Sequence, residues 1–150
     1  MKSIHKYLIL VSLLVLGVLP RIQAQDNLEI SKVFAKYGKQ KGSTMVEMTH
    51  EMLKDYDFSY YKSIVISNNP EAGDFARECL KVDQENSKKV KQVVAGGVVS
   101  SIYLQFPKKG KYYRLILFNE TTKPDRQMTL IYIESEKDSE EILNLILKKN

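Results

Sequence analysis

Three stretches rich in β-branched and aromatic residues follow one another near the C-terminus, at 98–106, 111–118 and 127–134. The first two are joined by the turn Pro107-Lys108-Lys109-Gly110, whose composition is typical of a hairpin. Strands that follow each other this closely usually pair with each other. The C-terminal half therefore predicts a three-strand antiparallel meander.

The segments before and after the meander predict two more strands and several helices. The strands are expected at 43–48 and 62–67, where β-branched residues gather. The helices are expected at 26–37, ended by Gly38 in a left-handed conformation; at 49–54; from Asn69-Pro70, with Asn69 as cap; at 83–94, stopped by Gly96-Gly97; and at 138–149.

This order of elements predicts an α+β fold in a single domain over residues 25–150. We expect a mixed, mostly antiparallel five-stranded sheet with the helices packed on one face and the C-terminal meander followed by a helix. The strands at 43–48 and 62–67 are left as either a parallel or an antiparallel pair, because a helix is expected between them.

The N-terminus has the three parts of a secretory signal peptide. Lys2 and Lys6 precede an uncharged apolar run at 8–19, and a small residue, Ala24, stands at the expected cleavage position. Twelve helical residues rise only about 18 Å, too little for a hydrocarbon core of about 30 Å. We therefore expect residues 1–24 to be a cleaved signal peptide, and an uncleaved N-terminal anchor is the alternative.

Removal of the leader changes the charge of the protein. The full chain has 23 basic and 18 acidic residues, and the leader takes away Lys2, Lys6 and Arg21, which leaves 20 and 18. The net charge falls from +5 to +2, so nucleic acid is not expected as a partner. No membrane span is expected after cleavage.

The leader and the succession of later segments also resemble a group of small exported Bacteroidota proteins of unknown function. The segments are Leu28 to Tyr37, Gly38-Lys39-Gln40-Lys41-Gly42-Ser43-Thr44-Met45-Val46-Glu47-Met48, Lys62-Ser63-Ile64-Val65-Ile66, and Leu130-Ile131-Tyr132-Ile133-Glu134 with the acidic turn and last helix that follow. The resemblance implies export to the periplasm or outer envelope of a Gram-negative bacterium. It implies no activity.

Residues for common catalytic and metal sites are scarce. His50 is the only histidine after the leader, and Cys79 is the only cysteine. His50-Glu51 begins like a zinc-protease helix, but the second histidine of that motif is replaced by Lys54. Cys79 lies on the apolar side of its expected helix, so we interpret it as a buried thiol, with an intermolecular disulfide or a nucleophile as alternatives. We expect no metal site, no cofactor and no enzymatic activity.

Two groups of carboxylates provide the alternative of a hydrolase acting on envelope glycans, because two suitably spaced carboxylates are sufficient for glycoside hydrolysis. The first is Asp55 with Asp57. The second is an acidic cluster that begins at Glu134 and continues into the last helix. Acidic residues at the start of a helix also stabilise that helix by themselves.

An aromatic segment supplies the candidate contact site, Tyr56, Phe58, Tyr60 and Tyr61. If the segment is extended, the alternating rings of Tyr56, Phe58 and Tyr60 face one way and form a platform. The alternative is that these rings cover the edge of the core. We accordingly expect an exported, non-enzymatic domain that acts by contact with a ligand or with another envelope protein. A structural subunit that self-associates through a strand edge is a further alternative.

Overall fold

The computed structural model describes residues 28–56 and 58–147, with side chains as far as residue 144. The expected leader lies outside the described residues. The elements are α2 (Ser31–Tyr37), β1 (Ser43–Met48), β2 (Phe58–Ser67), α3 (Pro70–Gln84), β3 (Lys89–Ala95), β4 (Val98–Lys109), β5 (Tyr112–Thr121), β6 (Gln127–Ser135) and α4 (Ser139–Leu147).

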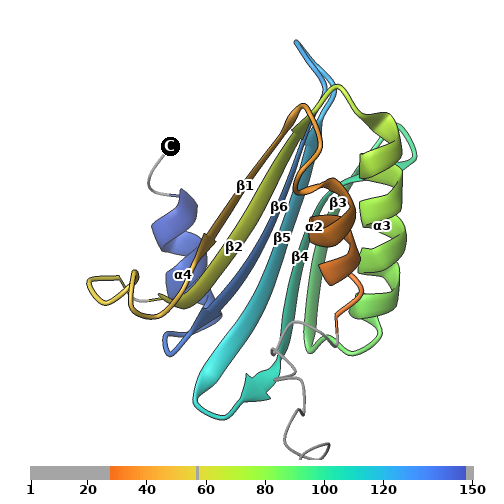
Figure 1. The fold of residues 1–150 in the computed structure, drawn as a ribbon. Helices are drawn as coiled ribbons and strands as arrows, with labels where there is room; N and C mark the ends of the chain where they lie inside the picture. Colours follow the sequence, from red (N-terminus) through yellow and green to blue (C-terminus); the bar gives the residue numbers. More distant parts are fainter. Residues whose placement is uncertain (1–27, 57, 148–150) are drawn as a thin grey trace, which may run out of the picture.

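All the strands belong to one six-stranded sheet in the order β1-β2-β6-β5-β4-β3 (Figure 1). Every neighbouring pair is antiparallel. The meander β4-β5-β6 and the helix after it confirm the expectation for the C-terminal half. The strands β1 and β2, for which parallel and antiparallel pairing were both left open, pair antiparallel, with Ser43 opposite Ile66. The expected mixed, five-stranded sheet is wrong, because the sheet has six strands and its pairs are all antiparallel.

The sixth strand is β3, which occupies the sequence expected to be a second helix at 83–94. The helix α3 ends at Gln84, and Lys89–Ala95 pairs with β4. Gly96 and Gly97 have φ values of 60° and 78° and form the two-residue turn between these strands. Two residues with positive φ make the tight turn that matches the twist of a hairpin. The glycine pair thus turns a hairpin, and the expectation that it stops a helix is wrong.

The helices α2 and α3 cover one face of the sheet and enclose the larger core. Asn69 caps α3 as expected, with its side chain accepting a hydrogen bond from the Ala72 backbone N–H at 3.0 Å. Core side chains from the helices and sheet include Val33, Phe34, Ala76, Leu80, Ile64, Leu104, Phe118 and Tyr132. Burial of these apolar side chains is the main contribution to the stability of the layer.

The last helix, α4, packs on the opposite face, so the expectation that all helices lie on one face is wrong. Ile142 of α4 packs in a second cluster with Tyr103, Leu115 and Ile133. Tyr103 stands between Ile102 and Leu104, which belong to the first core. Successive residues of a strand point to opposite faces, so this alternation places α4 across the sheet from α2 and α3 (Figure 1).

Two local expectations are also wrong. Gly38 follows α2 in a right-handed conformation, with φ −60° and ψ −23°. Glycine provides space here, because a Cβ atom would lie 2.7 Å from the Met45 Sδ atom. The segment 49–54 forms hydrogen-bonded turns and no helix. None of the helices in the described part of the chain has the length and apolar character needed to cross a membrane.

Candidate functional site

A pocket of about 360 Å³ lies where the β1–β2 connection meets the β6–α4 connection. The described residues that line it are His50, Tyr56, Phe58, Ser59, Glu136 and Lys137. The volume is within the range of small-ligand sites. The pocket combines two aromatic rings with a hydroxyl group, an imidazole and side chains of both charges, so it can offer stacking and hydrogen bonding to one ligand.

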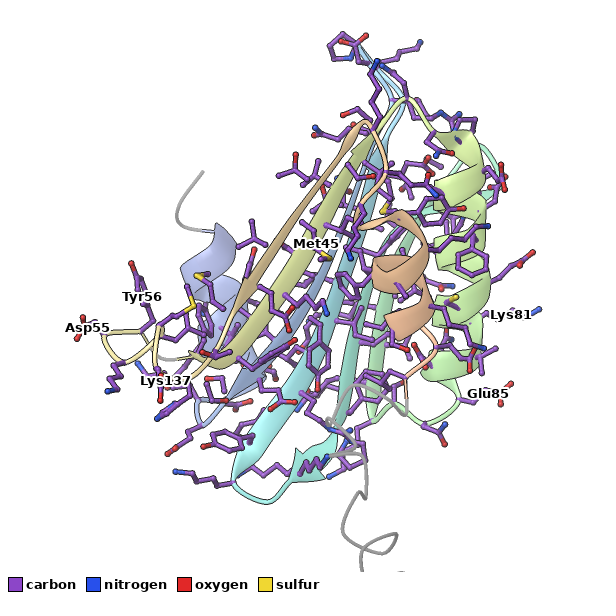
Figure 2. All side chains as sticks on the ribbon, viewed as in Figure 1. Met45, Asp55, Tyr56, Lys81, Glu85 and Lys137 are labelled. Carbon is purple, nitrogen blue, oxygen red and sulfur yellow. The ribbon has the colours of Figure 1, made fainter. Side chains whose placement is uncertain are left out.

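The β1–β2 connection is held in place by one buried side chain. Leu53 is only 2% exposed, and its backbone N–H donates to the Thr49 carbonyl at 3.1 Å. The Tyr56 N–H donates in turn to the Leu53 carbonyl at 2.8 Å. Leu53 anchors the loop, while Tyr56 is 61% exposed and projects outward beside Asp55 (Figure 2). The loop therefore presents a large ring to solvent from a fixed base.

A β-bulge at the start of β2 separates the rings that were expected to share a face. Phe58 stands opposite Ser135, and Tyr60 stands opposite Glu134, so Ser59 is the extra residue. Phe58 packs against the second cluster, on the α4 side, and Tyr60 packs against the first core. Phe58 and Tyr60 consequently lie on opposite faces of the sheet, and the expected platform of three rings does not form.

The four aromatic residues of the predicted site thus divide into two groups. Tyr56 and Phe58 line the pocket. Tyr60 meets the buried Tyr132 edge-on, with ring centres 6.0 Å apart, and its hydroxyl group hydrogen-bonds to Glu47. Tyr61 packs against the second cluster beneath α4. Tyr60 and Tyr61 are placed by packing, and only the first group faces a cavity.

The β6–α4 connection supplies the charged side of the pocket. The Lys137 N–H donates to the Ser135 Oγ atom at 3.0 Å, and Glu136 forms an ion pair with Lys111. Asp138 accepts hydrogen bonds from the Ser139 hydroxyl group and backbone N–H, which lower the pKa of Asp138. Asp138 of the acidic cluster therefore lies just before α4 and bonds to its first residue. Glu136 of the same cluster faces the pocket.

Most of the described carboxylates named for the hydrolase alternative lie outside this pocket, and Glu136 of the acidic cluster is the exception. Asp55 is exposed on the β1–β2 connection, and Asp57 lies outside the described residues. Glu134 lies on β6, where its Oε1 atom accepts a hydrogen bond from the Tyr132 hydroxyl group at 2.7 Å. Glu136 is the carboxylate among the described lining residues.

The pocket also contains residues that the sequence analysis did not assign to a site. Ser59 and Lys137 were not singled out, and His50 was considered only as part of an incomplete zinc-protease motif. The sequence gives one signal for them, since His50 and Tyr56 belong to a single short connection. Pairing of Phe58 with Ser135 brings that connection to Lys137, and this pairing depends on the sheet. Within the described ranges there is no group of three or more metal-ligating side chains.

Cys79 is 5% exposed on the core side of α3, which confirms the interpretation of a buried thiol. Burial raises the pKa of Cys79 to about 11, and the nearby carboxylates of Glu29 and Asp83 act in the same direction. A cysteine attacks as its thiolate, which is scarce at neutral pH when the pKa is so high. Cys79 thus acts as a small apolar side chain of the core.

Comparison with known proteins gives one family. A search of the curated proteins found no match. A family model described as "Family of unknown function (DUF6108)" matches residues 18–146, which is most of the chain and includes every strand and the pocket. The chain belongs to this family of unknown function.

Proposed function

We propose that this protein is an exported, non-enzymatic domain of the cell envelope that captures another envelope component at the pocket beside Tyr56. The single observation that carries the proposal is the exposure of the Tyr56 ring at the mouth of a cavity. Large aromatic side chains usually bury most of their area, and a ring held in solvent from an anchored loop is typical of a binding surface.

The lining of the pocket favours a polar ligand that has a flat apolar face. The rings of Tyr56 and Phe58 offer surfaces for stacking, and Ser59, Glu136 and Lys137 offer hydrogen-bonding groups. A sugar ring of an envelope glycan has this combination of an apolar face and a polar rim. Binding of this kind depends on stacking and on directed hydrogen bonds together.

We expect Tyr56→Ala to abolish capture of the partner from envelope extracts and to leave the fold intact. An exposed side chain away from the core contributes little to stability, so the free energy of unfolding should change by no more than about 0.5 kcal/mol. The measurement is a pull-down with the protein in the form recovered from cells, together with thermal unfolding of the variant.

The matched control is Val82→Ala, which removes an exposed apolar side chain of α3, on the sheet face opposite α4 and away from the pocket. It should leave capture unchanged. Tyr60→Ala is unsuitable for this purpose, because Tyr60 packs against the core and its loss would change stability. Unchanged capture by Tyr56→Ala would show that the partner binds elsewhere.

For the location, we expect mass spectrometry of the native protein to find Gln25 at the N-terminus. Cleavage after Ala24 removes the apolar run that directs export. Fractionation should place the processed protein in the envelope of the cell. Recovery of an intact Met1 on an intracellular species would contradict the proposed location, while the pocket could still be tested separately.

A further inference from the structure

A second cavity, the α3–β3 groove, runs between a helix and an edge strand. Its volume is about 230 Å³, and its lining residues are Arg77, Lys81, Gln84, Gln92, Val99 and Ile102. Val99 and Ile102 of β4 form an apolar floor, and the remaining four side chains form a polar and basic rim. The groove lies at the opposite edge of the sheet from β1 and is separate from the Tyr56 pocket.

The strand that borders this groove is open along one side. β3 is the last strand of the sheet, and all seven of its residues are exposed. It pairs with β4, and no other described strand lies on its outer side. An edge strand presents unpaired backbone N–H and C=O groups, to which an extended peptide can add as a further strand.

The register of β3 on β4 sorts its side chains into two rows. Val90 and Gln92 stand opposite Leu104 and Ile102, which face the core under α3. The residues that alternate with them, Lys89, Lys91 and Val93, point to the other face. Lys89 confirms this placement, because its Nζ atom lies 3.9 Å from the Glu140 carboxylate of α4. One row thus borders the groove, and the other row carries lysines.

The charges around β3 favour an acidic partner. In the described part of the chain, Lys81, Lys88 and Lys91 take part in no ion pair, and Lys89 has only its long contact with Glu140. Lys81 projects outward from α3, and Glu85 projects outward just after the helix ends (Figure 2). A second copy of the chain on this edge would bring lysines against lysines, which opposes pairing between two copies.

We propose that β3 takes up an extended segment of another protein as a seventh strand, and that this segment alternates acidic and apolar side chains. Its acidic side chains lie beside Lys89 and Lys91. Its apolar side chains point to the other face and enter the groove above Val99 and Ile102. The backbone of the added segment pairs with β3. The register of β3, its lysines and the apolar floor of the groove all favour the same alternation of acidic and apolar side chains.

The probe is a fluorescein-labelled eight-residue peptide of alternating glutamate and valine, added to the full protein as recovered from cells. We expect saturable binding by fluorescence anisotropy that weakens as salt rises. Hydrogen exchange should slow in β3 on peptide addition and stay unchanged in β1, the other edge strand. Slowed exchange in β3 separates strand addition from attraction between surface charges.

The test variant is Lys89→Glu with Lys91→Glu, which should weaken binding at least tenfold and give binding of an alternating lysine–valine peptide. The control is Lys39→Glu with Lys41→Glu, which changes the net charge equally at exposed sites before β1, at the opposite edge of the sheet. Its affinity should stay within about twofold of the parent.

Three results would overturn the proposal. The first is absence of peptide binding at millimolar concentration, and the second is equal weakening in the test and control variants. The third is protection of β3 before any peptide is added, which would show that a second copy or another part of the chain already covers the edge. Light scattering of the protein alone distinguishes those two occupants.

Discussion

Gly73→Ala should destabilise the protein by about 2 kcal/mol, and the same substitution should become neutral or stabilising when Glu120 is also replaced by alanine. Gly73 lies in α3, where an alanine would ordinarily favour the helix by about 0.5–1 kcal/mol. The expected reversal of sign identifies one contact, between the helix backbone and a buried carboxylate, as the reason for glycine at this position.

The Glu120 side chain occupies the space that a Cβ atom at residue 73 would need. Such an atom would lie 2.6 Å from the Glu120 Oε1 atom and 2.9 Å from its Oε2 atom. The Glu120 side chain is only 5% exposed, and it forms ion pairs with Arg77 and, at 3.1 Å, with Arg126. The carboxylate is held from both sides, so it cannot move away from a new methyl group without loss of these pairs.

The measurement is denaturant unfolding of the single and double variants. Glu120→Ala alone should cost about 3 kcal/mol, because it leaves the largely buried Arg77 guanidinium with the exposed Asp74 as its remaining ion-pair partner. Glu120→Gln is the matched control, since it keeps the size of the side chain and should keep the penalty of Gly73→Ala. An equal penalty in the Glu120→Ala background would assign the role of Gly73 to another contact.

Asp83→Ala should destabilise the protein by about 3 kcal/mol, because it leaves two backbone N–H groups without their acceptor. Asp83 is 3% exposed near the end of α3 and accepts hydrogen bonds from Glu29 at 2.7 Å and from Ile30 at 3.0 Å. These bonds fasten the segment that carries the buried Leu28 and Ile30 to the helix. The matched control, Asp74→Ala, removes an exposed carboxylate of the same helix and should change stability by about 0.5 kcal/mol or less.

The titration of Asp83 gives an independent test of this contact. Burial raises the pKa of Asp83, and the hydrogen bonds from Glu29 and Ile30 offset only part of that effect. The folded protein therefore binds this proton more tightly than the unfolded chain, whose aspartate pKa is about 3.9. Protonated Asp83 therefore contributes to the free energy of unfolding. This contribution is complete below the unfolded pKa and is lost as the pH rises through the folded pKa.

Asp83→Asn has no group that titrates at this position. The difference in unfolding free energy between parent and variant should therefore move in favour of the variant as the pH rises through this window. A difference that moves in favour of the parent would contradict the raised pKa. Thermal or denaturant unfolding at a series of pH values measures the trend.

Local patterns predicted the elements whose signals lie next to each other in sequence. Asn69-Pro70 marked the start of α3, and the turn at 107–110 marked a hairpin, although β4 continues to Lys109 and the turn is made at Gly110. The strand at 43–48 was predicted with its observed bounds. In each case a cap, a turn or β-branched composition acts within a few residues, so no distant contact is needed.

β3 was missed because its own composition is ambiguous. The segment after Gln84 is rich in charge, which favours an exposed helix, and its valines are consistent with either structure. Pairing with β4 across the Gly96-Gly97 turn decides for a strand. The glycine pair between β-branched residues was the available signal for a hairpin, and it was interpreted as a helix stop.

The sequence by itself determined an α+β chain with a C-terminal meander and helix, few groups for catalysis, and one buried thiol, because these follow from local propensity and composition. The tertiary structure alone decided which aromatic side chains share a surface. The bulge at Ser59 sends Phe58 to the α4 face and Tyr60 to the core, since one inserted residue reverses the alternation of a strand. The Tyr56 pocket and the α3–β3 groove exist only where distant segments meet through the sheet, and no local pattern encodes those meetings.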